Sequence, residues 1–375
     1  MIFLKNIARL LSPLLLFLLC GCNQASTLTS SDAIPNPTDP ASSVTGTSPH
    51  LIYELQTSEQ RLEAIDVGDI LGANCTFGCM TSAGQYVYYE ACEIAKPSDN
   101  YLKTTIYRLN TDMRRSEPLF EIENNGEPFL TNELRCVNDI LFWVYRDADT
   151  LKIDYYNIST AQQDTLKEYP DTTIDLILSG DNRFLSWFLP CESGISLYCF
   201  DTHLQTDICL TERATTDSPY TRAYINNGII SYLENVPGGR LLIIYDLVHN
   251  KEEYSCVLPE DFLLTRLQAN SNYAICTDGY SRDSSLFLLN RGEQKFEKIT
   301  LSDANYHIFS CHLYDDNIFL VSNLAGHLLN LSIDSGVFSD EVLDMNMIQT
   351  AISPDGLFYG YNPTKNLIFI LDIAS

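Results

Sequence analysis

Twelve cysteines give this sequence side chains that could hold a metal or form a redox pair. Ten of them lie downstream of residue 22, and none has the C-x-x-C spacing that is typical of zinc sites and dithiols. Cys75 and Cys79 lie four residues apart without a neighbouring histidine, so they do not favour a metal site. Cys199 and Cys209 flank a turn and could form a disulfide across a hairpin. Otherwise we expect buried free thiols, which in an exported protein would suggest an oxygen-poor habitat.

The histidines are the next candidates for chemistry. His203 and His249 follow apolar segments that end in Asp, where exposed turn positions are expected. His307 and His312 flank another apolar segment, which would face a central channel in the fold inferred below. His312 is therefore either a channel residue or a buried polar group with satisfied hydrogen bonds.

Acidic pairs lie in segments that we expect to be loops or turns, namely Asp147 with Asp149 and Asp315 with Asp316. A calcium loop needs more oxygen ligands at regular spacing and usually a glycine, so these are expected to be solvated turn residues. No phosphate-binding glycine loop occurs, and no nucleophile can be paired with a base. We therefore predict no catalytic, cofactor-binding or metal-binding residue.

The first 21 residues are typical of a signal peptide. A lysine and an arginine precede the apolar stretch LLSPLLLFLL, which is too short for an ordinary membrane span. The stretch ends in LCGC, which resembles the lipobox of bacterial lipoproteins, with Leu19 and the small Gly21 before Cys22. We predict that Cys22 carries the lipid, because the bulky Leu19 would precede the alternative Cys20. An ordinary secretory signal is the other interpretation.

The mature chain then divides into two parts. Residues 22–50 are rich in Ser, Thr and Pro and cannot bury enough apolar surface to fold, so a disordered tether is expected. Residues 51–375 are expected to be one globular domain, and their many aromatic side chains favour β structure. Removal of residues 1–21 changes the formal charge from −26 to −28, which disfavours binding to nucleic acid.

Two series of turn residues recur with one period. Short apolar segments end in Asp or Asn at spacings of 47, 44, 45, 44, 44 and 38 residues, at Asn110, Asn157, Asp201, Asp246, Asn290, Asp334 and Asp372. Upstream turn residues recur at similar spacing, at Gly84, Asp139, Asn182, Gly228, Asn272, Asn317 and Gly356. Four strands every 40–45 residues are typical of a β-propeller blade. We therefore predict an all-β, seven-bladed propeller of four-stranded antiparallel blades, with eight blades as the alternative and a β-sandwich as a remote one.

The last repeat carries a family resemblance. The segment ISPDGLFYGYNPTKNLIFILDI, with Ser353-Pro354-Asp355-Gly356 in its first turn, resembles the repeat of TolB-type propellers, and residues 178–210 resemble a degenerate copy. The resemblance covers roughly residues 61–375. It implies the fold and leaves the function open.

The last repeat also lacks its fourth strand, because the chain ends three residues after Asp372. Propellers commonly close by letting one terminus complete the blade begun by the other, which removes an exposed edge. We predict that Arg61–Ile65 supplies this strand and pairs with Leu367–Leu371. Residues 51–55 resemble a further third strand of a hairpin, so either a redundant strand or an eighth partial blade is expected there.

These features favour a monomeric binding module, held by its lipid on the extracytoplasmic face of the cell membrane, for an unknown protein or glycan ligand. An enzyme with its site in the channel, acting on polysaccharide or peptide, is one alternative. A structural subunit of an envelope complex is the other.

Overall fold

Residues 42–375 form one compact unit in the computed structural model. The structure describes residues 50–56, 62–72, 75–94, 101–123, 133–147, 150–170, 176–192, 194–216, 222–258, 260, 262–278, 285–293, 295–302, 306–322, 326–343 and 347–373. The predicted signal peptide, Cys22 and most of the tether therefore lie outside the described residues. Within the described ranges every regular element is a β-strand, and no helix is long and apolar enough to cross a membrane.

Two sheets are simple antiparallel meanders of four strands, in which neighbours along the chain are neighbours in the sheet. Their strands are β3 (Cys75–Ala83), β4 (Tyr86–Ile94), β5 (Tyr101–Asn110) and β6 (Arg115–Glu123), then β7 (Leu134–Val137), β8 (Ile140–Asp147), β9 (Thr150–Asn157) and β10 (Gln162–Pro170). Buried and more accessible residues alternate along much of β9, because one face of the sheet is more deeply packed than the other.

The next eight strands form one larger sheet. They are β11 (Leu178–Gly180), β12 (Phe184–Cys191), β13 (Gly194–Asp201), β14 (Thr206–Thr215), β15 (Tyr224–Asn226), β16 (Ile229–Val236), β17 (Gly239–Asp246) and β18 (Lys251–Leu258). Two residue pairs between β14 and β16 join what would otherwise be two meanders: Ala214 pairs with Glu234, and Thr215 pairs with Leu233.

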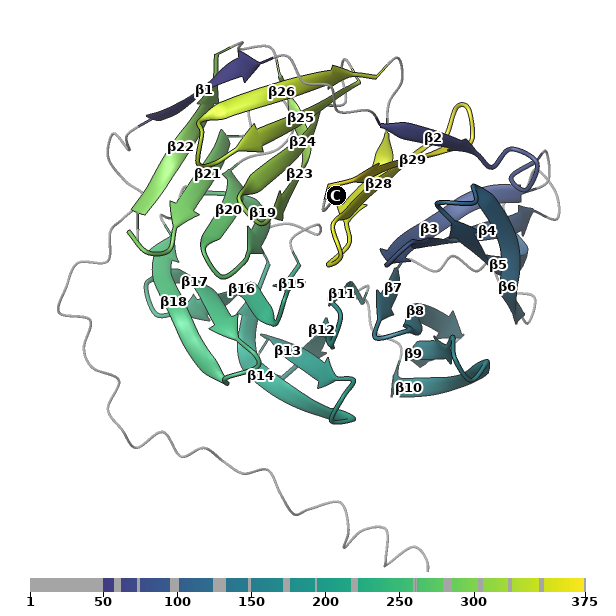
Figure 1. Cartoon of the computed structure of the whole chain (residues 1–375). Coiled ribbons are helices and arrows are strands. Elements are labelled where there is room, and N and C mark those ends of the chain that lie inside the picture. The colour runs from purple at the N-terminus through teal and green to yellow at the C-terminus, as the bar shows by residue number, and fades with distance from the viewer. Residues whose placement is uncertain are drawn as a thin grey trace, which may run out of the picture. The chain divides into compact units, whose positions relative to one another are not determined.

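A nine-stranded sheet contains β19 (Leu264–Ala269), β20 (Tyr273–Asp278), β21 (Ser285–Asn290) and β22 (Lys295–Leu301), then β1 (His50–Gln56), β26 (Val337–Val342), β25 (His327–Ser332), β24 (Asn317–Ser322) and β23 (Ile308–Tyr314). The strand β1 lies between β22 and β26 and is parallel to both (Figure 1). Tyr53 of β1 is buried in a hydrophobic cluster with residues of β20–β26, and this packing anchors the strand. Residues 51–55 are thus an extra strand, as one alternative expected. They do not form a hairpin with the strand that follows.

The expectation of separate four-stranded antiparallel sheets is therefore met only in part. Three sheets have four strands, whereas the β14–β16 contact and the parallel strand β1 merge the others. Both mergers cover strand edges that would otherwise expose unpaired backbone groups.

The third four-stranded sheet closes the fold with the N-terminal segment. Its order is β2 (Glu63–Asp66), β29 (Leu367–Asp372), β28 (Leu357–Asn362) and β27 (Ile348–Ile352). In β2, Glu63 pairs with Ile370 and Ile65 pairs with Ile368. Ile65 is 4% exposed and packs in the cluster that also holds Ile368. The predicted closing strand is thereby confirmed, with its first residue at Glu63.

The first strands of the successive meanders lie innermost. The strands β3, β7, β11, β15, β19, β23 and β27 contact one another in this order, and β27 contacts β3 (Figure 1). Side chains on one inner strand bond the backbone of the next. The amide of Cys136 donates to Thr81 Oγ1 (3.2 Å), that of Ile225 to Ser179 Oγ (3.2 Å), that of Leu313 to Gln268 Oε1 (2.8 Å), and Gln349 Nε2 donates to Gly78 O (2.7 Å).

The recurrent turn residues act as predicted. Asn157 Oδ1 accepts from the amides of Ser159 and Thr160, and Asp246 Oδ1 accepts from the amide of Val248. Four members of the upstream series have φ between +53° and +84°, a region that Gly and Asp tolerate: Gly84, Asp139, Gly228 and Gly356. Local turn chemistry thus explains the repeat.

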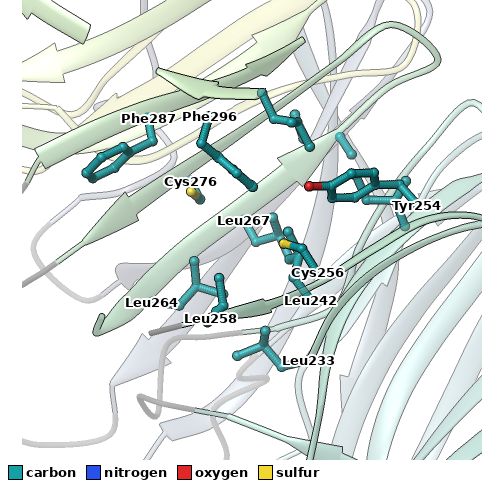
Figure 2. Close-up of a cluster of buried hydrophobic side chains, with 14 of the residues drawn as sticks. Leu233, Leu242, Tyr254, Cys256, Leu258, Leu264, Leu267, Cys276, Phe287 and Phe296 are labelled. Atoms are coloured by element: carbon teal, nitrogen blue, oxygen red, sulfur yellow. The ribbon is translucent and has the colours of Figure 1, made fainter. Parts of the chain in front are cut away.

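Hydrophobic clusters fill the space between neighbouring sheets. Figure 2 shows one cluster between β16–β18 and β19–β22, with the two thiols Cys256 and Cys276 among Leu, Phe and Tyr side chains. The ten cysteines that the structure describes are all free, six of them buried. Cys199 pairs with Ile208 while Cys209 pairs with Tyr198, so the two thiols lie on opposite faces. The alternative of a disulfide between them is wrong.

Candidate functional site

The innermost strands surround a cavity of about 370 Å³. Each of the strands β3, β7, β11, β15, β19, β23 and β27 contributes residues to its wall. The cavity therefore lies on the axis about which the sheets are arranged, where a propeller offers its central channel.

His312 is the one histidine that the sequence placed at a channel, and it lies in the cavity wall. Its Nε2 lies 3.0 Å from Thr350 Oγ1, which also bonds Ser310 Oγ. Burial and the nearby charge of Arg266 lower the pKa of His312 to about 3, so the ring is neutral at physiological pH. His312 is thus both a wall residue and a hydrogen-bonded buried group.

Of the other sequence candidates, Cys79 also lines the cavity, whereas His203, His249, Asp315 and Asp316 do not. His249 follows β17 in a turn and its Nδ1 lies 2.7 Å from Asp246 Oδ2, while His203 lies in the turn after β13. Asp315 and Asp316 form the turn between β23 and β24. Among the described residues no group of three or more His, Cys, Asp or Glu could hold a metal ion. The side chains of the acidic pair at 147 and 149 lie outside the described part.

A cluster of charged side chains in the cavity wall was not predicted. Glu133 directly precedes β7, is 7% exposed, and forms ion pairs with Arg135 (2.6 Å) and Arg222 (3.2 Å). Arg222 comes from the residues before β15, 89 positions away from Glu133. A third guanidinium, that of Arg266 in β19, lines the same cavity.

These four residues give the wall a positive balance. Three arginines and one glutamate are the charged residues that line the cavity, so two positive charges remain formally uncompensated. The whole chain has a formal charge of −26. Arg135 and Arg222 keep 24% and 35% of their side-chain surface accessible, because they line the cavity.

The arginines perturb one another. Burial lowers the pKa of Arg222, and the like charges of Arg135 and Arg266 lower it further against the opposing Glu133. The pKa of Arg135 is raised in spite of burial, because Glu133 stabilises its charge. Glu133 therefore compensates the charge of Arg222 less than that of Arg135.

Glu90 lies behind the wall and adds no full negative charge near pH 7. It is completely buried, its Oε2 accepts from the amide of Cys79 at 3.0 Å, and burial raises its pKa to about 8. A Cβ at Gly78 would lie 2.2 Å from Glu90 Oε2, so only glycine leaves room for this carboxyl. Gly78 is thus required because the Glu90 carboxyl approaches its Cα closely.

Nucleophilic groups in the wall are inactive as placed. Burial raises the pKa of Cys79 far above its ordinary value and that of Cys136 to about 12, so both remain thiols. The neutral His312 is hydrogen-bonded to Thr350. The wall offers guanidinium, amide and hydroxyl donors, which suit binding better than covalent catalysis.

The turn residues that carry the family resemblance serve a structural role. Asp355 Oδ2 accepts from the amide of Gly84 at 2.8 Å and Oδ1 accepts from Asn182 Nδ2 at 3.3 Å. The Ser353 hydroxyl accepts from the amide of Leu357 at 3.0 Å. The motif therefore ties the last sheet to the first at the inner turns.

The sequence contained one signal for the arginine cluster. Arg222 and Arg266 are 44 residues apart and Arg135 and Arg222 are 87 apart, which are one and two periods of the repeat. Equivalent positions of a circular repeat face the same axis, so arginines in phase would meet at the centre.

Comparisons with known proteins support the fold. The structure is similar to the β-propeller domain of the trilobed protease from Pyrococcus furiosus, with a TM-score of 0.53 and 12% identity, covering 80% of this chain and 94% of that one. The fold is a β-propeller. A chain of the mitotic checkpoint complex has a TM-score of 0.54 and 13% identity, covering 84% and 92%. The acylaminoacyl peptidase of Pyrococcus horikoshii has a TM-score of 0.54 and 9% identity, covering 80% of this chain and 51% of that one.

These identities are too low to carry function from any of these proteins to this chain. No protein-family model matches the sequence, and no curated protein matches it either.

Proposed function

We propose that this protein is a lipid-anchored, extracytoplasmic β-propeller lipoprotein that binds a ligand in its central cavity. The signal-like residues 1–21, the lipobox ending at Cys22 and the Ser/Thr/Pro-rich segment after it support the anchor. A rigid ring held away from a membrane by a tether presents its cavity to the medium.

The proposed ring has seven blades of the TolB type. The circular order of the innermost strands supports this number, since six of them begin a meander of four strands and β27 begins one of three that β2 completes. In this interpretation β1 is an addition between two blades, and the β14–β16 contact bridges two others. An eighth blade has no innermost strand among the described residues.

The cavity wall is the observation that carries the proposal. It combines polar side chains from all the innermost strands with three arginines, against which Glu133 is the one carboxylate of the described wall. A volume of about 370 Å³ is at the small end for ligand sites, which favours a small molecule or the end of a glycan over a folded protein.

Binding is favoured over catalysis because no activated nucleophile lies in the wall. The thiols there are protonated, and the pKa of His312, lowered to about 3, makes it too weak a base to activate the Thr350 hydroxyl beside it. A hydrolase would need a nucleophile beside a base, or two carboxyl groups facing each other.

The test is a binding screen with product analysis. The chain from residue 23 is screened against glycans and small metabolites by thermal shift, and bound compounds are recovered and identified by mass spectrometry. Ala351→Phe, which enlarges a side chain in the cavity wall, should abolish binding, whereas Leu204→Phe on an exposed turn should not. Recovery of converted compounds would favour the enzyme, and binding unaffected by Ala351→Phe would place the site elsewhere.

A further inference from the structure

The three wall arginines differ in how many of their donors are already used. Arg135 donates from Nε to Leu178 O (3.1 Å) and from Nη1 to Leu134 O (2.7 Å), and its Nη2 pairs with Glu133. Every nitrogen of this guanidinium therefore has a protein acceptor. Arg135 holds the inner strands together and is not available to a ligand.

Arg222 and Arg266 keep open donors. Arg222 donates from Nη1 to both carboxylate oxygens of Glu133, at 3.2 and 3.3 Å, and its Nε and Nη2 have no acceptor within the described residues. Arg266 donates from Nη2 to Phe309 O at 2.7 Å, and its Nε and Nη1 likewise have none there. A guanidinium presents such donors in a planar fork that matches carboxylate and phosphate oxygens.

A neutral hydroxyl lies beside them. Tyr224 in β15 lines the same cavity and its hydroxyl donates no hydrogen bond within the described part of the chain. Burial raises its pKa above the ordinary range, so the phenol keeps its proton and can donate it in a hydrogen bond. Arg222 and Tyr224 are held on one inner segment, and Arg266 on the neighbouring inner strand.

Glu133 sets the orientation and limits the charge. Its ion pairs fix Arg222 against the wall while Arg135 shares the carboxylate. Three arginines and one glutamate leave a formal charge of +2, which a ligand with one or two negative charges would neutralise in part or in full. The repulsion between Arg222 and its two like-charged neighbours would be relieved by an anion at the cavity.

We propose that the cavity binds a small organic anion, a carboxylate or a phosphate ester, held between the open guanidinium edges of Arg222 and Arg266 with the Tyr224 hydroxyl as a further donor. This rests on the proposed function and names the ligand class for the same site. The small volume excludes a bulky polyanion from the cavity. The whole chain has a net charge of −26, so this positively charged wall is a local site of attraction for anions on an otherwise acidic protein.

The experiment uses the chain from residue 23 and probes that differ in one group. Isothermal titration and thermal shift are measured with glucuronate, glucose 6-phosphate and glucose, and with acetate and inorganic phosphate as group-level probes, all at one ionic strength set with sodium chloride. The carboxylate and phosphate arms decide between the two sources of the anion. We expect at least one anionic probe to bind while glucose does not.

The variants assign the binding to the two arginines. Arg222→Met and Arg266→Met should each weaken binding about tenfold or more, because each removes a charged donor pair. Arg222→Lys keeps the charge without the fork and should retain part of the affinity. Arg213→Met is the matched control, since Arg213 is an exposed arginine paired with Glu234 outside the cavity, and it should bind as the wild type does.

Two results would overturn the inference. One is the absence of any anion-specific binding or stabilisation relative to chloride, and the other is anion binding that survives both Arg222→Met and Arg266→Met. If glucose or another neutral compound binds and Ala351→Phe abolishes that binding, the proposed function stands and only the anion inference fails. If Ala351→Phe affects no ligand at all, both fail.

Discussion

Removal of the closing strand β2 tests the ring architecture most directly. Four residue pairs join β2 to β29, which corresponds to about four backbone hydrogen bonds worth roughly 0.5–1.5 kcal/mol each. Burial of Ile65 adds about 1.5–3 kcal/mol. The loss should therefore be about 4–9 kcal/mol, a large part of a typical stability of about 5–15 kcal/mol.

The assay is urea unfolding of three truncated chains that begin at residues 50, 62 and 67. The chain from 50 keeps β1 and β2 and should match the chain from 23. The chain from 62 loses β1, and the chain from 67 loses β2 as well. We expect a further fall in the free energy of unfolding between the last two, with loss of the fold as the extreme outcome.

A matched pair of point variants separates β2 from the effects of truncation. Ile65→Ala removes a buried side chain and should destabilise by about 2–5 kcal/mol. Glu63→Ala changes an exposed residue of the same strand, whose ion pair with Arg114 is exposed and worth at most about 1 kcal/mol. Equal unfolding free energies for these two variants, or for the chains from 62 and 67, would refute closure by β2.

Three further predictions follow from other parts of the chain. Cys22→Ala should release the protein from membranes in cell fractionation while Cys20→Ala should not, and a soluble Cys20→Ala protein would show that the lipobox is misassigned. Tyr53→Ala should lower the free energy of unfolding in urea by about 3–5 kcal/mol, because it removes the buried side chain that holds β1 in place. Ile52→Ala, at a position 64% exposed, is the control and should change little. A small effect at Tyr53 would mean that this side chain does not hold β1. Because Glu90 keeps in the fold a proton that the unfolded chain releases above about pH 4.5, stability should fall by about 1.4 kcal/mol per pH unit up to about pH 8. Glu90→Gln should remove this contribution, and identical pH profiles of unfolding for the wild type and the variant would contradict it.

The repeat was readable from the sequence because its signals are local. The side chain of Asn157 or Asp246 accepts hydrogen bonds from amides two or three residues ahead, so the residue that stabilises each turn lies next to it in the sequence. The same local logic predicted the closing strand, since the last repeat lacked one strand and the first was preceded by one. The buried thiols followed from their apolar neighbours.

The charged cavity was decided by tertiary structure. Glu133 and Arg222 are 89 residues apart and lie just before the short strands β7 and β15, without a motif around them. Which of the arginines has spare donors depends on carbonyl groups of other strands, such as Leu178 O for Arg135 and Phe309 O for Arg266. Contacts of this kind exist only after the ring has closed.

The place of β1 shows the same division. Its sequence resembles the third strand of a hairpin, and strand formation there was correctly expected. Its partners are β22 and β26, which lie far along the chain, and the pairing is parallel. Strand propensity depends on the residues themselves, whereas the choice of edge depends on which edges the folded ring leaves open and on the space that receives Tyr53.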